Sequence, residues 1–80
     1  MYMCSGSYAN YCCIDQDSVC PVPTSVSHEL AAASFLQGLT AHYLVTSTFP
    51  VKQGDRVLVH AGAGGTGALV IQMAKLKGAT

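Results

Sequence analysis

The pattern of apolar and polar positions divides the chain into successive predicted elements. Residues 7–14 are rich in aromatic and small apolar side chains, which is typical of a β-strand. Residues 19–22 form a second short apolar run, which Pro21 and Pro23 restrict to the edge of a sheet or to an exit from it. The polar residues 15–17 between the two runs predict a turn.

The middle of the chain has the pattern of a helix. From His28 to Thr46, apolar side chains recur at helical spacing. Either Ser25 or Ser27 can cap this helix, because a serine oxygen accepts a hydrogen bond from an open N–H group of the first turn. Gly38 lies inside the run, so two shorter helices fit the pattern as well as one long helix. A turn at residues 52–55 ends the segment.

The last third of the chain has the order strand, glycine-rich loop, helix. Residues 56–61 are a nearly continuous, β-branched apolar run, which suits a central parallel strand covered on both faces. A helical pattern covers residues 68–77, and Gly78 is the kind of residue that stops a helix at its C-terminus. The order predicts the α/β class.

Composition and charge narrow the classes of function. The 80 residues are 50% hydrophobic, and four basic residues balance four acidic ones, so the formal net charge is zero. The chain therefore has no excess of positive charge that would attract nucleic acid or an anionic membrane. The sequence has neither an apolar stretch long enough to span a bilayer nor the start of a signal peptide. We therefore expect a cytoplasmic protein with no nucleic-acid or membrane partner.

All four cysteines lie in the first quarter of the chain, at positions Cys4, Cys12, Cys13 and Cys20. Without a secretion signal, a framework of two disulfides is not favoured. The spacing also lacks the paired C-x-x-C arrangement of a zinc site. We expect these residues to be small, buried and reduced side chains.

The glycine-rich loop carries the strongest chemical signal. Gly62, Gly64 and Gly67 satisfy the pattern G-x-G-x-x-G between a predicted strand and a predicted helix. Such glycines permit a tight turn, a close approach of main chain to a pyrophosphate and close packing of helix on strand. The pyrophosphate then meets open N–H groups at the helix N-terminus. The alternative is a tight turn that binds nothing.

Two other glycine loops fit less well. A P-loop is disfavoured because no Gly-Lys-Ser/Thr sequence follows. The glycine loop of a protein kinase lies between two strands, whereas a helix is predicted after this one.

Three blocks of sequence together resemble the quinone oxidoreductase (zeta-crystallin-like) branch of the medium-chain dehydrogenase/reductase superfamily. The first block is Leu-Gln-Gly-Leu-Thr-Ala-His-Tyr at 36–43, and the second is residues 51–61. The third is the loop, whose family form is A-x-x-G-G-V-G. The matching positions are Ala61, Gly64, Gly65 and Gly67, with Thr66 in place of the usual valine.

The resemblance implies a specific domain organisation. Residues 1–26 resemble the last strands of a GroES-like catalytic β domain. Residues 27–80 resemble the N-terminal part of a doubly wound, Rossmann-like NAD(P)-binding domain. We accordingly expect the chain to be a fragment that joins two larger domains and that is inactive on its own.

The resemblance also implies an activity, namely hydride transfer from NADPH to a quinone or another α,β-unsaturated carbonyl, in a parent protein that forms a homo-oligomer. NADH is a possible alternative cofactor, because the residue that would distinguish the ribose of NADH from that of NADPH is expected beyond Thr80. The reaction is expected to need no metal, because Leu36 stands where zinc-dependent relatives have a cysteine ligand. Two alternatives remain: an enoyl reductase domain of a fatty-acid or polyketide synthase, and a non-enzymatic piece that binds cofactor or a partner chain.

The implied cofactor-binding residues come from two segments, and no catalytic residue is assigned. They are Gly62, Gly64, Gly65, Thr66, Gly67 and Thr40. Thr40 matches a threonine near the nicotinamide in related enzymes, and its alternative role is a mid-helix threonine bonded to a preceding carbonyl. His42 and Tyr43 are expected to pack the helix, and His60 to be a hydrogen-bonded core histidine rather than a ligand contact.

Overall fold

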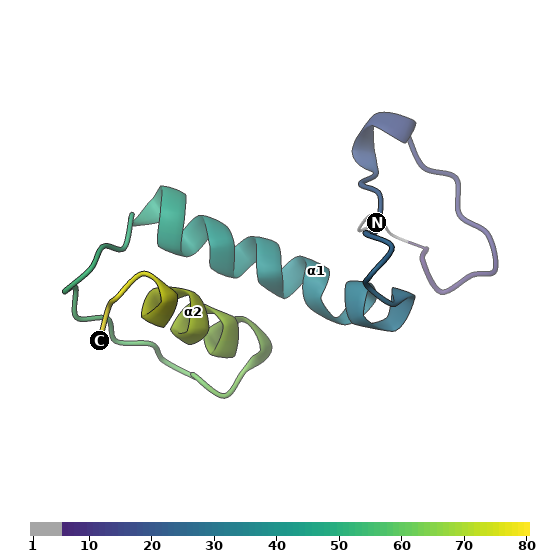
Figure 1. Cartoon of the computed structure of the whole chain (residues 1–80). Coiled ribbons are helices and arrows are strands. Elements are labelled where there is room, and N and C mark those ends of the chain that lie inside the picture. The colour runs from purple at the N-terminus through teal and green to yellow at the C-terminus, as the bar shows by residue number, and fades with distance from the viewer. Residues whose placement is uncertain (1–5) are drawn as a thin grey trace. The chain divides into compact units, whose positions relative to one another are not determined.

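The computed structural model describes residues 6–80, and its main elements are two α-helices (Figure 1). The chain divides into two compact units, with the division between Phe35 and Leu36. Among the described residues, no helix combines the length and the apolar character that crossing a bilayer requires. Cys4 lies outside the described residues.

In the first unit, the strands predicted at residues 7–14 and 19–22 are wrong. Both segments lack regular secondary structure in the described chain, and nearly all of their side chains are exposed, including Tyr8 and Tyr11. A strand needs a neighbouring strand for its backbone N–H and C=O groups, and residues 6–27 form no β-bridge. The β part of the predicted α/β fold is therefore not present as strands in residues 6–80.

The exposed chain of the first unit also corrects the prediction for the cysteines. Cys12, Cys13 and Cys20 are all exposed rather than buried, because no sheet covers them. The polar turn between the two apolar runs is confirmed as a short 3-10 helix, η1 (Gln16–Ser18). The Asp15 carboxylate accepts a hydrogen bond from the Asp17 backbone N–H at 3.0 Å, which fixes the start of that turn.

Helix α1 (His28–Tyr43) begins at the predicted cap. The Ser27 hydroxyl oxygen accepts a hydrogen bond from the Leu30 backbone N–H at 3.2 Å, which identifies Ser27 rather than Ser25 as the cap. The helix passes Gly38 without a break, so the alternative of two shorter helices is wrong. It ends at Tyr43, and a π-helical segment, η2 (Leu44–Thr48), continues it.

Helix α2 (Gly65–Leu76) begins three residues before the predicted start and ends at the predicted stop. Gly78 has a φ of 81°, in the left-handed region that glycine adopts at little cost. Its N–H donates to the Lys75 carbonyl at 2.9 Å, and the Ala79 N–H donates to the Ala74 carbonyl at 3.0 Å. This pair of bonds is a Schellman motif, which satisfies carbonyls that the helix end leaves open.

The segment predicted as a parallel strand is extended but is not assigned as a strand in the described chain. Two hydrogen bonds nevertheless connect its start to the end of the chain. The Thr80 N–H donates to the Asp55 carbonyl at 2.9 Å, and the Val57 N–H donates to the Thr80 carbonyl at 2.8 Å. Thr80 is thus bonded to two residues, Asp55 and Val57, that lie two positions apart in the other segment. This is the hydrogen-bond pattern of two parallel strands. Within residues 55–80, the extended segment is followed by α2, and the chain then comes back so that Thr80 lies parallel to the start of the extended segment.

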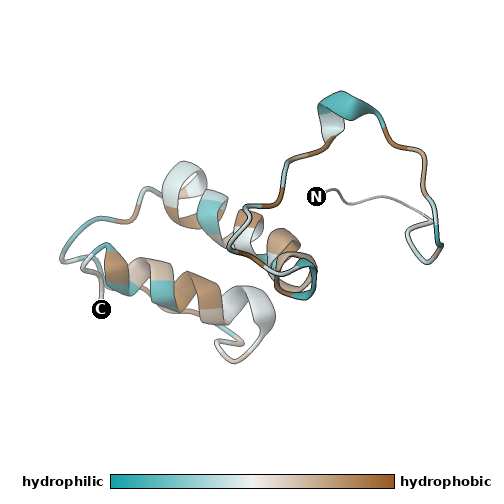
Figure 2. Ribbon diagram, turned by 45° about the vertical axis from the view of Figure 1, so that its right-hand side comes forward, coloured by the Kyte–Doolittle hydropathy of each residue, from teal (hydrophilic) through white to brown (hydrophobic). Residues whose placement is uncertain are grey.

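A small apolar core holds the second unit together. Val45, Val51, Ala74 and Ala79 are buried in one cluster, and Val57, Val70 and Met73 pack against it. Helix α2 packs on η2 through this cluster, and Figure 2 shows hydrophobic residues along most of α2. The chain turns into the extended segment at residues 52–55, where the predicted turn is confirmed by a bond of 3.2 Å from the Asp55 N–H to the Lys52 carbonyl.

Candidate functional site

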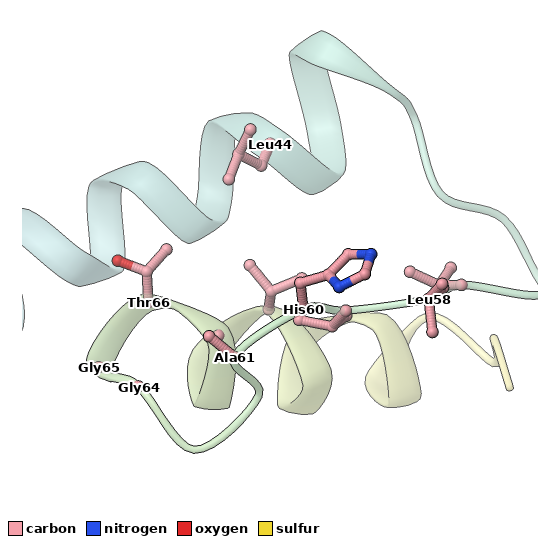
Figure 3. A pocket seen from close by; sticks show the side chains of 11 residues that line it. Leu44, Leu58, His60, Ala61, Gly64, Gly65 and Thr66 are labelled. Atoms are coloured by element: carbon pink, nitrogen blue, oxygen red, sulfur yellow. The ribbon is translucent and has the colours of Figure 1, made fainter.

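A cavity of about 490 Å³ opens between the extended segment, the glycine loop and the start of α2. Its walls come from three stretches of the second unit, as Figure 3 shows. Leu44 of η2 lies over one side, residues 57–61 form the floor, and the start of α2 closes the end. The remaining lining residues are Gly64, Gly65, Thr66, Gly67 and Val70.

The N-terminus of α2 supplies the polar groups of this cavity. The first hydrogen bond of the helix runs from the Ala68 N–H to the Gly64 carbonyl, at 2.9 Å. The N–H groups of Gly65, Thr66 and Gly67 therefore have no partner within the helix. Gly64 occupies the cap position and has no side chain with which to cap them. Open N–H groups and the positive end of the helix dipole together favour an anion at this point.

Close packing within the loop explains its glycines better than unusual backbone angles do. A Cβ atom on Gly67 would collide with the Ala61 carbonyl oxygen and would lie 3.0 Å from the Gly62 Cα atom. A Cβ on Gly64 would lie 3.2 Å from the same carbonyl oxygen. Ala61 itself takes the left-handed conformation, with a φ of 52°. The loop is therefore folded tightly against the helix start, and Gly64, Gly65 and Gly67 bring no side chain of their own to it.

The sequence-predicted site residues do not all reach this cavity. Gly64, Gly65, Thr66 and Gly67 line it, whereas Gly62 and Thr40 do not. A Cβ on Gly62 would lie 2.7 Å from the Ile71 side chain, so Gly62 faces α2. The Thr40 hydroxyl donates to the Leu36 carbonyl at 2.8 Å, as the alternative role for this residue predicts.

Three residues expected to pack inside the protein are instead exposed. His42 and Tyr43 lie at the C-terminal end of α1, and the Tyr43 side chain is 51% exposed. His60 is exposed and lines the cavity, so the prediction of a core histidine is wrong. In each case the side chain is exposed because no other described segment of this unit packs over that face of α1 or of the extended segment.

Gln37 is a residue at the loop that sequence analysis did not single out. Its side-chain Cγ lies 3.1 Å from the position of a Cβ on Gly65, so the two residues are in contact. The Gln37 Oε1 atom is buried without a hydrogen-bond partner. The only sequence signal for it is its place in the block that resembles the family, three residues before Thr40. No group of three or more His, Cys, Asp or Glu side chains suited to a metal ion occurs within residues 6–80.

Comparison with known proteins identifies relatives with this arrangement. No protein-family model matches the chain. The chain is 43% identical over 72 residues to a probable quinone oxidoreductase of Schizosaccharomyces pombe, covering 90% of the chain and 22% of that protein. It is also 43% identical over 74 residues to quinone oxidoreductase 1 of Escherichia coli, covering 92% of the chain and 23% of that protein. Over these residues, the chain is homologous to the quinone oxidoreductases.

Solved structures agree with this assignment. A mycobacterial protein in complex with NADPH is 57% identical, with a TM-score of 0.70 over 72% of the chain and 18% of that protein. Quinone oxidoreductase of Escherichia coli, also in complex with NADPH, is 45% identical, with a TM-score of 0.76 over 80% of the chain and 20% of that protein. The resemblance found in the sequence is confirmed, and the chain spans less than a quarter of the relatives it matches.

A further relative belongs to a different kind of protein. Mycoketide-CoA synthase of Mycobacterium tuberculosis is 39% identical over 61 residues, which cover 76% of the chain and 2% of that protein. A segment homologous to this chain thus also occurs within a much larger protein.

Proposed function

We propose that the second unit holds the diphosphate of NADPH at the N-terminus of α2, within a zinc-independent oxidoreductase that reduces a quinone or another α,β-unsaturated carbonyl. The observation that carries the proposal is the set of open N–H groups of Gly65, Thr66 and Gly67 at the cavity wall. The NADPH complexes of two homologous proteins support the identity of the ligand.

The start of α2 offers groups that suit a diphosphate. The wall at the helix start carries no Cβ atom at Gly64, Gly65 or Gly67, so main chain can approach the diphosphate directly. The Thr66 side chain adds a hydroxyl that can donate to a phosphate oxygen. Bound here, NADPH would supply the hydride, while these residues bind and orient its diphosphate.

The rest of the proposed activity follows from homology and from two residues. Leu36 offers no ligand atom for zinc, which supports a reaction without metal. Thr40 lies one turn further along α1 and outside the cavity, and we keep it as a nicotinamide contact only by resemblance. We further propose that residues 1–26 belong to a GroES-like domain and residues 27–80 to a Rossmann-like domain. In that setting the parallel bonds of Thr80 begin the next strand of the sheet.

A second candidate function is an enoyl reductase domain of a polyketide or fatty-acid synthase, which the similarity to mycoketide-CoA synthase supports. Both activities would use the same diphosphate site, so this site does not distinguish them. The acceptor does, because a quinone takes up the hydride in one case and an enoyl thioester does so in the other.

The proposal is tested by measuring NADPH binding by fluorescence titration, together with NADPH oxidation in the presence of 1,4-benzoquinone or of crotonyl-CoA. We expect saturable NADPH binding to the chain that is lost in the Gly64→Asp and Gly67→Asp variants. The added Cβ atom crowds the Ala61 carbonyl oxygen, and the carboxylate repels the diphosphate. Oxidation is compared in the same preparations, and in a homologous full-length oxidoreductase as the positive control. Equal binding by the chain and by both Asp variants would contradict the proposed site.

A further inference from the structure

The charged side chains are divided unevenly between the two units of the chain. All four lysine and arginine residues lie in the second unit, residues 36–80, together with one acidic residue, so the side-chain charge of this unit is +3. The first unit, residues 1–35, has three acidic residues and no lysine or arginine, so its side-chain charge is −3. The net charge of zero therefore comes from two units of opposite sign.

The positive charges of the second unit gather at one end of that unit. There the turn at 52–55 lies beside the C-terminal end of α2 (Figure 1). The Gly54 N–H donates to the Gly78 carbonyl at 3.0 Å, and the Thr80 N–H donates to the Asp55 carbonyl at 2.9 Å. The segments held together by these bonds carry four basic residues, all of them exposed, which we call the basic cluster: Lys52, Arg56, Lys75 and Lys77.

The chemistry of a helix end explains only part of the basic cluster. A cation near the C-terminus of a helix offsets the negative end of the helix dipole, which accounts for Lys75 in the last turn of α2. Lys52 and Arg56 belong to a different segment, and the helix end does not require them. The carboxylate of Asp55 accepts a hydrogen bond from the Lys52 backbone N–H at 2.8 Å, so it holds the turn. One carboxylate among four cations leaves an excess of positive charge at this end.

The acidic residues of the first unit are also exposed. Asp15 and Asp17 lie two positions apart at η1, and Glu29 lies in the first turn of α1. The hydrogen bond from the Asp17 backbone N–H to the Asp15 carboxylate fixes the η1 turn, as described above. A short, capped turn at residues 15–17 thus presents two carboxylates to solvent.

We propose that the basic cluster is a docking surface for the acidic segment 15–17 of a second copy of this chain. Opposite charges on two surfaces steer their encounter and fix their orientation. Because each copy has no net charge, no overall repulsion opposes the pair. In a pair with two-fold symmetry, the acidic segment of each copy meets the basic cluster of the other, so both contacts form together.

This inference is independent of nucleotide binding, since Lys75 and Lys77 lie at the opposite end of α2 from the glycine loop. A second copy also matches the charges better than nucleic acid does. A polyanion would be attracted by the second unit and repelled by the first, whereas a second copy offers each unit a surface of opposite sign.

The test is sedimentation equilibrium of the full chain over a range of protein concentrations and at two salt concentrations. Exposed ion pairs are individually weak, so we expect a dissociation constant of about 0.1–1 mM at about 0.01 M salt. The average mass should then rise with concentration above the 8.3 kDa of one copy. The dissociation constant should rise about tenfold or more at about 0.15 M salt, where the Debye length has fallen from about 30 Å to about 8 Å.

Two charge-reversal variants test the pairing of the two surfaces. Lys75→Glu with Lys77→Glu changes the side-chain charge of the second unit from +3 to −1, and Asp15→Lys with Asp17→Lys changes that of the first unit from −3 to +1. We expect neither variant to associate by itself, because its two surfaces then have the same sign. An equimolar mixture of the two should associate again, since each variant offers the other a surface of opposite sign.

The matched control is Lys75→Arg with Lys77→Arg, which keeps both positive charges and should associate like the unmodified chain. Circular dichroism checks that the helices are retained in each variant. A duplex DNA of about 12 base pairs is titrated in parallel at the lower salt concentration, because a basic surface is also the kind of site that binds the phosphates of nucleic acid.

Association of the unmodified chain that is lost in each charge-reversal variant and restored in their mixture would support the inference. A mass of one copy at every concentration would overturn it, and so would association that is insensitive to salt or that survives in either charge-reversal variant alone. Binding of the duplex by a chain that stays monomeric would also overturn it and would assign the basic cluster to nucleic acid. None of these results bears on the nucleotide site, which is tested separately.

Discussion

The carbonyl oxygen of Ala61 occupies the space that a Cβ atom on Gly67 would need. The same oxygen accepts a hydrogen bond from the Gly64 N–H at 2.9 Å. Ala61 holds this carbonyl in place from a left-handed conformation with a φ of 52°, which non-glycine residues rarely adopt. One carbonyl group therefore fixes both the turn of the loop and its distance from the start of α2.

Replacing Gly67 with alanine should open the loop. We expect Gly67→Ala to lower the free energy of unfolding by about 1–3 kcal/mol, because the added methyl group forces Ala61 and α2 apart. The NADPH affinity should fall by about tenfold or more, which corresponds to about 1.4 kcal/mol of binding free energy. Urea denaturation and fluorescence titration measure the two effects.

Gly38→Ala is the matched control for that experiment. Gly38 lies in α1 with no atom near the position of an added Cβ. Alanine should therefore stabilise the helix by about 0.5–1 kcal/mol and leave NADPH binding unchanged. The account of the loop fails if both alanine variants have the same stability and the same affinity.

Two glycines with positive φ should respond differently to alanine. Gly54 has a φ of 87° and Gly78 a φ of 81°, so alanine is strained at both, by about 1–2 kcal/mol. A Cβ on Gly78 would in addition lie 2.9 Å from the Gln53 Cγ atom, whereas a Cβ on Gly54 would meet nothing. We expect the larger loss of stability in Gly78→Ala, measured by urea denaturation. Adding Gln53→Ala to Gly78→Ala should remove the additional loss of stability that this variant shows relative to Gly54→Ala. Equal losses of stability in Gly54→Ala and Gly78→Ala would count against the Gln53 contact.

The helix cap can be tested with two serines that the sequence alone did not distinguish. Ser27→Ala removes the acceptor of the Leu30 N–H and should cost about 1 kcal/mol of stability. Ser27→Asp should preserve the cap, and Ser25→Ala should have no effect. Circular dichroism during urea denaturation follows the loss of helix. A loss of stability in Ser25→Ala that equals the loss in Ser27→Ala would refute the assignment.

Gln37 provides a test of the packing between α1 and the loop. Its Oε1 atom is buried without a partner, which is an unfavourable state for a polar atom. Gln37→Met keeps the length and the methylene groups that contact Gly65 and removes the amide. We expect the melting temperature to be unchanged or higher. A clear loss of thermal stability would mean that the amide has a favourable partner in solution.

The features that the sequence predicted correctly depend on local chemistry. Three such features are the Ser27 cap, the turn at 52–55 and the helix end at Gly78. Each depends on residues only a few positions apart, so it can be predicted from the neighbouring sequence. The start of α2 was placed three residues too late, because Gly65, Thr66 and Gly67 have low intrinsic helix propensity. Packing of the loop against the helix overrides that propensity.

The features that were predicted wrongly depend on distant partners. Residues 7–14 have the composition of a strand, but a strand forms only against another strand, and none pairs with them in the described chain. The exposure of Cys12, Cys13 and His60 has the same origin, since burial depends on what covers a side chain. The glycine loop was correctly placed before a helix, although the extended segment that precedes it is not assigned as a strand. Its glycines are required by contacts within the loop itself.

The central claim is that a nucleotide diphosphate binds to the open N–H groups at the start of α2. The most direct measurement is the change in backbone amide chemical shifts of the ¹⁵N-labelled chain on titration with NADPH. We expect the largest shifts at Gly65, Thr66 and Gly67, and little change at Lys75 at the other end of the helix. Saturable NADPH binding that leaves those three amides unchanged would contradict the account.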